Sequence, residues 1–170
     1  MTEFQPIFDK LMAIEGGFAE DDAGCGPVKY GINAKFLKLL KLPHSRDDVF
    51  NMTLDYARAI YIRVYWNPYK VGAILSQALA QTFYIGLINL PSKRACKYLQ
   101  AAANSLGARL TVDGLIGSKT LAAINAPNVS GTIREVFKQL LRGWYHYLAE
   151  TYPDKHRKHL KGWLARVEAS

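Results

Sequence analysis

The chain has 170 residues, of which 49% are apolar and 21% charged, with two cysteines and a net charge of +8. This composition excludes a disordered chain, and two cysteines without metal-ligand spacing exclude a fold stapled by disulfides or zinc. The charge is uneven: residues 1–80 carry nine basic and nine acidic side chains, whereas residues 81–170 carry thirteen and five. A basic second half favours a polyanionic partner such as cell wall, nucleic acid or a membrane surface.

Helical periodicity dominates the first half of the chain. Apolar residues recur at helical spacing over 4–14, and Gly16–Gly17 is expected to end that helix. The acidic, glycine-rich segment 20–31 has no helical period and predicts a loop or a short β-hairpin. Shorter helices are expected over 34–42 and over 54–65, the second of them capped by Thr53.

The second half is also predicted to be helical. Residues 71–92 carry no charge, but their polar side chains and terminal proline argue against a membrane span, so we expect a buried central helix. Further helices are expected over 91–105, 119–124, 132–151 and 157–167, with a turn-rich linker over 106–118. Thr132 and Glu135 have the spacing of a capping box at the start of the long helix. The chain is therefore assigned to the mainly α class.

Glu15 is the first candidate catalytic residue. Positions 4, 8, 11 and 15 share one helix face, and the first three are Phe, Phe and Leu. An apolar surrounding and the negative end of the helix dipole both raise the pKa of a carboxyl group. A carboxyl that stays protonated near neutral pH is what a glycosidic general acid requires, although a boundary glutamate that extends into water would have the same spacing.

A second carboxylate for such chemistry is available in the loop that follows. Glu20, Asp21 and Asp22 lie shortly after Glu15, and a glycosidase pairs its acid with a carboxylate that activates water or stabilises positive charge. Simple solvation of an acidic loop is the competing interpretation.

The ordered motifs of the first half resemble those of glycoside hydrolase family 108. They are Glu15-Gly16-Gly17-Phe18, Lys29-Tyr30-Gly31-Ile32-Asn33, Ala57-Arg58-Ala59-Ile60-Tyr61 and Tyr65-Trp66-Asn67-Pro68. The second half is similar to the predicted peptidoglycan-binding region of that family, through Asn89, Arg94-Ala95, Leu99-Gln100, Asp113 to Thr120 and Gly162 to Val167. The resemblance thus runs from residue 4 to residue 167.

This resemblance implies a lysozyme-like, two-lobed helical fold with a small β-hairpin or loop after the catalytic glutamate. Residues 1–80 would form the catalytic lobe, and residues 81–170 a helical peptidoglycan-binding lobe continuous with it. The family comprises muramidases among phage endolysins and secretion-associated, bacteriolytic wall hydrolases. The implied reaction is hydrolysis of the β-1,4 bond between N-acetylmuramic acid and N-acetylglucosamine, with Glu15 as the general acid.

Departures from the family pattern affect the second catalytic group. Val28 stands where the family usually has a threonine, which in lysozymes of this type helps to position the attacking water, and Asn33 replaces another threonine. Asp22 is the predicted partner of Glu15, with Asp21 in reserve, and Lys29 or Asn33 as alternative hydrogen-bonding groups. Ile85 occupies a position where the family commonly has aspartate.

The substrate-binding residues are predicted partly from this resemblance and partly from residue type. Aromatic rings suit the C–H faces of sugars, and Arg142 with Tyr145 is expected to contact stem peptides. The full predicted set is Asp21, Lys29, Tyr30, Asn33, Trp66, Asn89, Arg142 and Tyr145. No metal and no cofactor is expected.

The predicted partners are peptidoglycan glycan strands and stem peptides, with no nucleic acid, no stable membrane insertion and a monomeric state. The acidic N-terminal segment lacks a cationic signal region, so we expect synthesis in the cytoplasm and action in the periplasm or cell wall after assisted export or holin-type release. One alternative is a catalytically impaired peptidoglycan-binding protein. Another is a basic helical nucleic-acid binder, for which the sequence contains no reader motif.

Overall fold

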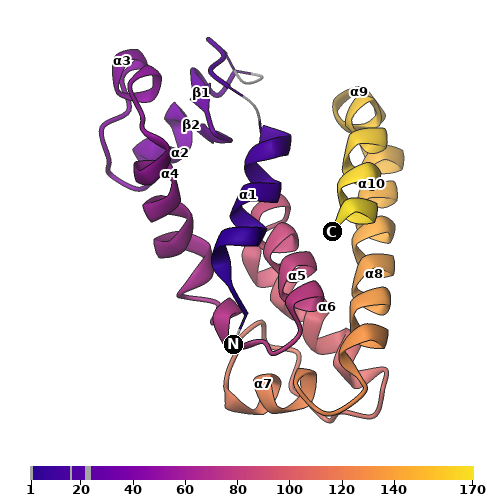
Figure 1. Cartoon of the computed structure of the whole chain (residues 1–170). Coiled ribbons are helices and arrows are strands. Elements are labelled where there is room, and N and C mark those ends of the chain that lie inside the picture. The colour runs from indigo at the N-terminus through magenta and orange to yellow at the C-terminus, as the bar shows by residue number, and fades with distance from the viewer. Residues whose placement is uncertain (1, 16, 22–23) are drawn as a thin grey trace. The chain divides into compact units, whose positions relative to one another are not determined.

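The computed structural model describes residues 2–15, 17–21 and 24–170, and for Ile14 and Glu15 it describes the backbone alone. The chain divides into two compact units (Figure 1). The first unit is Phe4–Val64, and the second is Tyr65–Ser170 together with Thr2 and Glu3.

The first unit combines short helices with one small sheet. In chain order its elements are α1 (Phe4–Glu15), β1 (Val28–Lys29), β2 (Ile32–Asn33), α2 (Ala34–Leu39), α3 (Arg46–Phe50) and α4 (Leu54–Tyr61), and a π-helical segment, Ile62–Trp66, continues into the second unit. Its apolar core includes Phe8, which packs edge-on against Tyr61 with ring centroids 5.9 Å apart. Ile32 of β2 and Leu37 of α2 are also buried in this unit.

The predicted hairpin is present after the acidic loop. Strands β1 and β2 are antiparallel, with Val28 opposite Asn33 and Lys29 opposite Ile32. The two residues between the strands, Tyr30 and Gly31, have φ of 53° and 73°, as a tight hairpin turn requires. A further bridge joins Ala19 to Val28, so the loop that carries the acidic residues begins and ends against this sheet.

Two helix boundaries in the first unit differ from the prediction, and one helix was not predicted. The helix expected over 34–42 ends at Leu39, and the helix expected over 54–65 is α-helical only to Tyr61 before it widens into the π-helical segment. Helix α3 was not predicted at all. Its N-terminus is a complete capping box, because Ser45 and Asp48 each accept a hydrogen bond from the other residue's backbone N–H.

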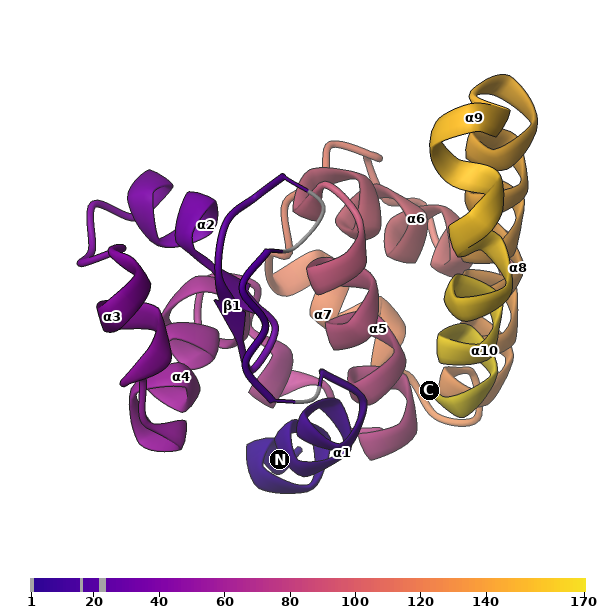
Figure 2. The same ribbon diagram turned by 90° about the horizontal axis from the view of Figure 1, so that it is seen from above.

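The second unit is a helical assembly around α5. Its elements are η2 (Val71–Ala73), α5 (Gln77–Asn89), α6 (Ser92–Asn104), α7 (Ser118–Ile124), α8 (Ser130–Thr151), α9 (Pro153–His156), η3 (Arg157–His159) and α10 (Leu160–Ala169). Helix α5 packs against α6 and α8, and α8 packs against α6 and α10. Within this unit α10 lies alongside the long α8 in Figure 1 and also in Figure 2, which is seen from above.

Helix α5 is the buried central helix that the uncharged segment predicted. All residues from Leu79 to Leu87 are buried, including the polar Gln81 and Thr82. The uncharged segment is not one helix, however, because Ser76 accepts a hydrogen bond from the backbone N–H of Leu79 and thereby begins α5 after η2. Within the described residues, no helix has the length and apolar character needed to cross a membrane.

The other helices of this unit correct two expectations. Helix α8 begins at Ser130, and its N-cap is Val129 without a side-chain hydrogen bond, so the predicted capping box of Thr132 and Glu135 is wrong. The expected basic helix over 157–167 is replaced by α9, η3 and α10, which begin at Pro153 and end at Ala169. Pro153 occupies the first position of α9, where proline favours the start of a new helix after α8.

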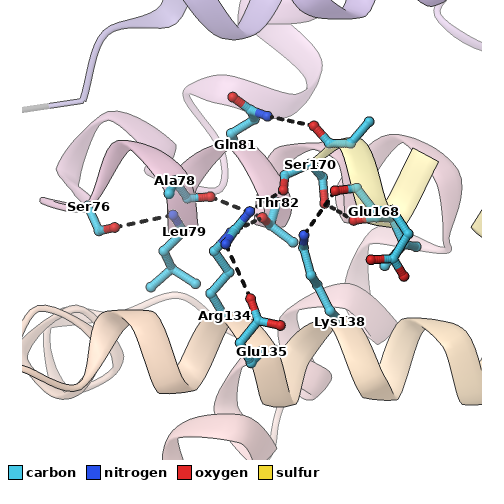
Figure 3. A network of polar contacts seen from close by, with 12 residues as sticks. Ser76, Ala78, Leu79, Gln81, Thr82, Arg134, Glu135, Lys138, Glu168 and Ser170 are labelled. Carbon is cyan, nitrogen blue, oxygen red and sulfur yellow. Dashed lines mark hydrogen bonds and ion pairs between the residues drawn. The ribbon is translucent and has the colours of Figure 1, made fainter. Parts of the chain in front are cut away.

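Polar contacts tie the end of α10 to α5 and α8 (Figure 3). Arg134 donates to the hydroxyl of Thr82 at 3.1 Å and to the carbonyl oxygen of Ser170. Lys138 donates to the carbonyl oxygen of Glu168 at 3.3 Å. Because Arg134 and Lys138 both come from α8, this helix supplies the cations that bind the carbonyl groups at the end of α10.

Candidate functional site

The predicted catalytic acid is the last residue of α1. Phe8 and Leu11, which share a helical face with position 15, are both buried. The side chain of Glu15 and the whole of Asp22 lie outside the described residues, and so does Gly16. The catalytic roles of Glu15 and Asp22 therefore stay predictions.

Asp21 has a local structural role in the acidic loop. Its carboxylate accepts hydrogen bonds from the backbone N–H of Gly24, at 3.0 Å, and from that of Gly26, also at 3.0 Å. Both glycines have φ of 80°, a conformation that disfavours residues with a β-carbon. Asp21 thus holds the backbone in place at Gly24 and Gly26.

Glu20 is bound by Arg46, a residue that was not among the sequence predictions. Arg46 of α3 forms a two-pronged contact with the Glu20 carboxylate, with N–O distances of 2.9 and 2.5 Å. This hydrogen bonding lowers the pKa of Glu20. Glu20 is therefore an ionised, engaged carboxylate.

Two phenylalanines complete the surroundings of Arg46. The guanidinium lies 5.5 Å from the ring centroid of Phe18 and 5.6 Å from that of Phe50. The two rings meet edge-on at 5.1 Å. The aromatic position of the Glu-Gly-Gly-aromatic motif thus anchors α3, and the capping box at Ser45 was the signal that could have revealed this helix.

Lys29 and Tyr30 join the same group of residues. The Lys29 ammonium donates to the carbonyl oxygen of Phe50 at 2.6 Å and lies 5.3 Å from the Tyr30 ring centroid. The carbonyl of Tyr30 accepts a hydrogen bond from the hydroxyl of Tyr61 at 3.0 Å. We name the set formed by Phe18, Glu20, Lys29, Tyr30, Arg46 and Phe50 the hairpin cluster.

Asn33 and Val28 show what the two departures from the family pattern do to the fold. Asn33 is the N-cap of α2, and its side-chain oxygen accepts from the backbone N–H of Phe36 at 2.9 Å. Threonine is also a capping residue, so this replacement preserves the cap. Val28 pairs through its backbone with Ala19 and Asn33, and these contacts need no side-chain hydroxyl.

Trp66 and Asn89 belong to the second unit. Trp66 is half-buried, its ring packs edge-on against Tyr84 at 5.8 Å, and it lies against Gly72. Asn89 is the last residue of α5 and donates to the carbonyl oxygen of Ile85 at 3.0 Å. The contacts of these two residues with substrate stay predictions.

Arg142 and Tyr145 both lie on α8. Arg142 binds the carboxylate of Glu168 through two nitrogens, at 2.8 and 2.6 Å. Tyr145 is 3% exposed, and its ring lies 5.0 Å from that of Trp163. Burial raises the pKa of Tyr145 to about 12. The structure thus assigns both residues a role in joining α8 to α10, and their role in binding stem peptides stays a prediction.

The hairpin cluster combines chemistry that suits a glycan. Aromatic rings, two cations and the carboxylate of Glu20 lie together on the unit that carries Glu15. Aromatic rings pack on the C–H faces of sugars, and charged groups bind hydroxyls and amides. The predicted residues Lys29 and Tyr30 are brought together here, whereas Trp66, Asn89, Arg142 and Tyr145 belong to the other unit.

Both the sequence and the fold of the chain are similar to those of known proteins. Residues 8–87 match the family described as Glycosyl hydrolase 108, and residues 94–168 match the one described as Predicted Peptidoglycan domain. The solved structure of Brucella abortus SagA is similar, with a TM-score of 0.71, 22% sequence identity, and coverage of 98% of this chain and 96% of that chain. At this identity the likeness concerns the fold, and it confirms the predicted mainly helical, lysozyme-like fold. No curated protein matches the chain.

Proposed function

The chain belongs to the glycosyl hydrolase 108 family, and from this premise we propose that it is a muramidase. Family membership makes it a glycoside hydrolase of lysozyme-like type, and the matched peptidoglycan domain makes peptidoglycan its substrate. Its site of action is accordingly the periplasm or cell wall. The proposed reaction is hydrolysis of the β-1,4 bond between N-acetylmuramic acid and N-acetylglucosamine.

The position of Glu15 carries this proposal. It is the last residue of α1, it follows the buried positions Phe8 and Leu11 on one face, and it directly precedes the acidic loop. A carboxyl group at the apolar end of a helix is disfavoured in its charged form, which suits a group that must donate a proton. Glu15 protonates the oxygen of the leaving sugar, and positive charge develops at the anomeric carbon.

The contacts of the acidic loop favour Asp22 as the second catalytic group. Glu20 is engaged by Arg46, and Asp21 is engaged by the backbone N–H groups of Gly24 and Gly26. A carboxylate that fixes the loop is poorly suited to orient a water molecule as well. Asp22 is the third member of the triplet, so we assign to it the task of orienting water or stabilising the positive charge.

Two of the predicted substrate-binding residues in the first unit have partly accessible side chains. Lys29 and Tyr30 of the hairpin cluster are half-buried and lie on the unit that carries Glu15. We propose that they contact the glycan, while Asp21 and Asn33 support the loop and α2. For the second unit by itself, we propose that Trp66 and Asn89 contact peptidoglycan.

The test uses the release of reducing ends from purified peptidoglycan, followed by borohydride reduction. A muramidase leaves muramic acid at the new reducing end, so reduced muramic acid is the expected product, and reduced glucosamine would contradict the proposed bond. Glu15→Gln is expected to lower kcat by about 100-fold or more, because general acid catalysis contributes on the order of 10²–10⁴. Glu3→Gln, an exposed change of the same kind, is the control.

Two further variants separate the loop carboxylates. Asp22→Asn is expected to lower kcat by more than about tenfold with little change in thermal stability. Asp21→Asn is expected to act through loop geometry and therefore to change stability and KM as well. If only Asp21→Asn abolishes hydrolysis, the assignment of the partner is wrong.

One observation favours a second candidate function. Val28 stands where the family has a water-positioning threonine, which would suit a peptidoglycan-binding protein with impaired catalysis. Binding of the wild-type protein to insoluble peptidoglycan without release of reducing ends would favour this alternative over the muramidase.

A further inference from the structure

A groove between α6 and α8 lies outside the chemistry proposed so far. It has a volume of about 500 Å³, and its lining includes Arg94 and Tyr98 from α6 and Gly143, Trp144 and Tyr147 from α8. All of these residues belong to the second unit, within the matched peptidoglycan domain. The groove is therefore complete within one compact unit.

Arg94 is the charged group of this groove. Its guanidinium lies 3.5 Å from the ring centroid of Trp144, which is a face-to-face stack. Its Nε is buried, and no acceptor among the described residues takes a hydrogen bond from this guanidinium. By contrast, Arg134 and Arg142 of α8 are each paired with a glutamate, Glu135 and Glu168.

A stacked guanidinium keeps its hydrogen-bonding edge available. The N–H groups point outward in the plane, whereas the stack uses the face, so Arg94 is held in one orientation with its donors unused. A planar fork of this kind fits the two oxygens of a carboxylate. Nε is buried beyond the reach of a ligand, whereas neither Nη group is among the buried unpaired atoms, so an anionic ligand would accept hydrogen bonds from the two Nη groups.

The rest of the groove supplies apolar surface and space. Trp144 stacks on Tyr147 at 5.4 Å between centroids, and Tyr147 is half exposed. Gly143 is in the interior of α8, where glycine is less favourable than alanine, and a β-carbon added there would meet nothing within 4 Å. No packing contact requires this glycine, and its missing side chain keeps the groove open.

We propose that this groove binds the stem peptide of peptidoglycan, with a peptide carboxylate on Arg94 and the neighbouring aliphatic part against Tyr98 and Tyr147. This inference rests on peptidoglycan being the substrate, as in the proposed function. The lactyl carboxyl of muramic acid is amide-linked to the stem, so the free carboxylates of the polymer lie on the peptide and not on the glycan. An unpaired arginine beside aromatic rings therefore points to the peptide.

The test is isothermal titration of the full chain with a synthetic stem tetrapeptide that contains D-glutamate and diaminopimelate with free carboxylates. The same peptide with amidated carboxylates is the matched ligand. The free form is expected to bind at least about tenfold more tightly, and Arg94→Gln is expected to remove that difference, as a charge-assisted hydrogen bond implies. Lys161→Gln, which removes one exposed charge from α10, is expected to bind like the wild type.

A second pair of variants tests the groove without removing the Arg94–Trp144 stack. Gly143→Glu and Gly143→Gln introduce side chains of similar size into open space, so both are expected to fold. The glutamate adds a negative charge and is expected to weaken binding of the free tetrapeptide at least about tenfold relative to the glutamine. Equal affinity of the two variants would overturn the assignment of a carboxylate to this groove.

The remaining outcomes separate this inference from the muramidase proposal. Glycan strands stripped of their peptides serve as the substrate for hydrolysis. If the wild type cleaves them but does not bind the tetrapeptide, or binds a phosphate polymer and not the peptide, the groove assignment is wrong while the muramidase stands. If it binds the tetrapeptide in an Arg94-dependent way without cleaving glycan, the groove assignment is supported and the muramidase is refuted.

Discussion

The turn at Gly114 offers a sharp test of how the second unit is built. Gln100 of α6 is 1% exposed, accepts from the backbone N–H of Gly114 at 2.8 Å and donates to the Asp113 carboxylate at 2.8 Å. Gly114 has φ of 83°, and a β-carbon there would lie 2.8 Å from Cγ of Lys93 and 2.9 Å from its carbonyl oxygen. The Lys93 side chain can move away from such a carbon, but its backbone carbonyl belongs to α6 and cannot.

The change Gly114→Ala therefore has two costs. A left-handed conformation costs an L-residue about 1–2 kcal/mol, and forcing extra volume against fixed atoms costs a further 1–3 kcal/mol. Loss of unfolded-state entropy returns about 0.4–1 kcal/mol. The net destabilisation is about 1–5 kcal/mol, which for a chain of this length lowers Tm by about 2–20 °C.

The assay is thermal unfolding followed by calorimetry, with Gly117→Ala as the matched control. Gly117 belongs to the same turn, but its φ is −97° and a β-carbon there would have open space. Its replacement is expected to change stability by less than about 1 kcal/mol. If Gly114→Ala lowers Tm no more than Gly117→Ala does, the backbone contact with α6 does not control this turn.

Three further predictions concern single side chains. At pH about 8, a thiol reagent is expected to label Cys25 but not Cys96, because Cys96 is buried and burial raises its pKa to about 12. Intact mass spectrometry would show one adduct in the native protein and two in denaturant. The hydrogen bond from Gln100 lowers the pKa of Asp113, so the ionised Asp113 stabilises the fold at neutral pH, and this stability is lost as pH falls below about 4. In the variant Asp113→Asn, Tm is therefore expected to depend less on pH in that range. Val28→Thr is expected to raise kcat with a Tm change of at most a few degrees, since the half-buried strand position tolerates either β-branched residue; unchanged kcat would show that the hydroxyl does not limit water attack.

Local sequence signals predicted the elements that depend on nearby residues. The apolar stripe of α1, the Thr53 cap of α4 and the loop-to-hairpin segment are short-range features, and all three are present. Helix α3 has an equally local signal at Ser45 and Asp48, but it spans only Arg46–Phe50 and carries too few apolar residues for a helical period. Short helices are found by their caps and not by their periodicity.

The parts that could not be predicted depend on contacts between distant residues. Arg46 meets Glu20, Lys29 meets the carbonyl of Phe50, and Arg94 meets Trp144, each across many residues of sequence. Only the fold decides which arginine is paired and which is stacked with its donors unused. The start of α8 was misjudged for a related reason, because burial of Ile133 and Phe137 holds the helix from Ser130 without a side-chain cap.

The motif residues of this chain divide into those that hold the fold and those that remain for chemistry. Phe18 packs against Phe50, Asn33 caps α2, and Asp113 with Gly114 is bound by Gln100, so these positions are explained by structure alone. Glu15 differs from these residues because its role rests on the sequence, in which it follows Phe8 and Leu11 at helical spacing. Ionisable groups placed on an apolar helix face are characteristic of functional sites, so a catalytic role for Glu15 stays the prediction that its sequence position supports.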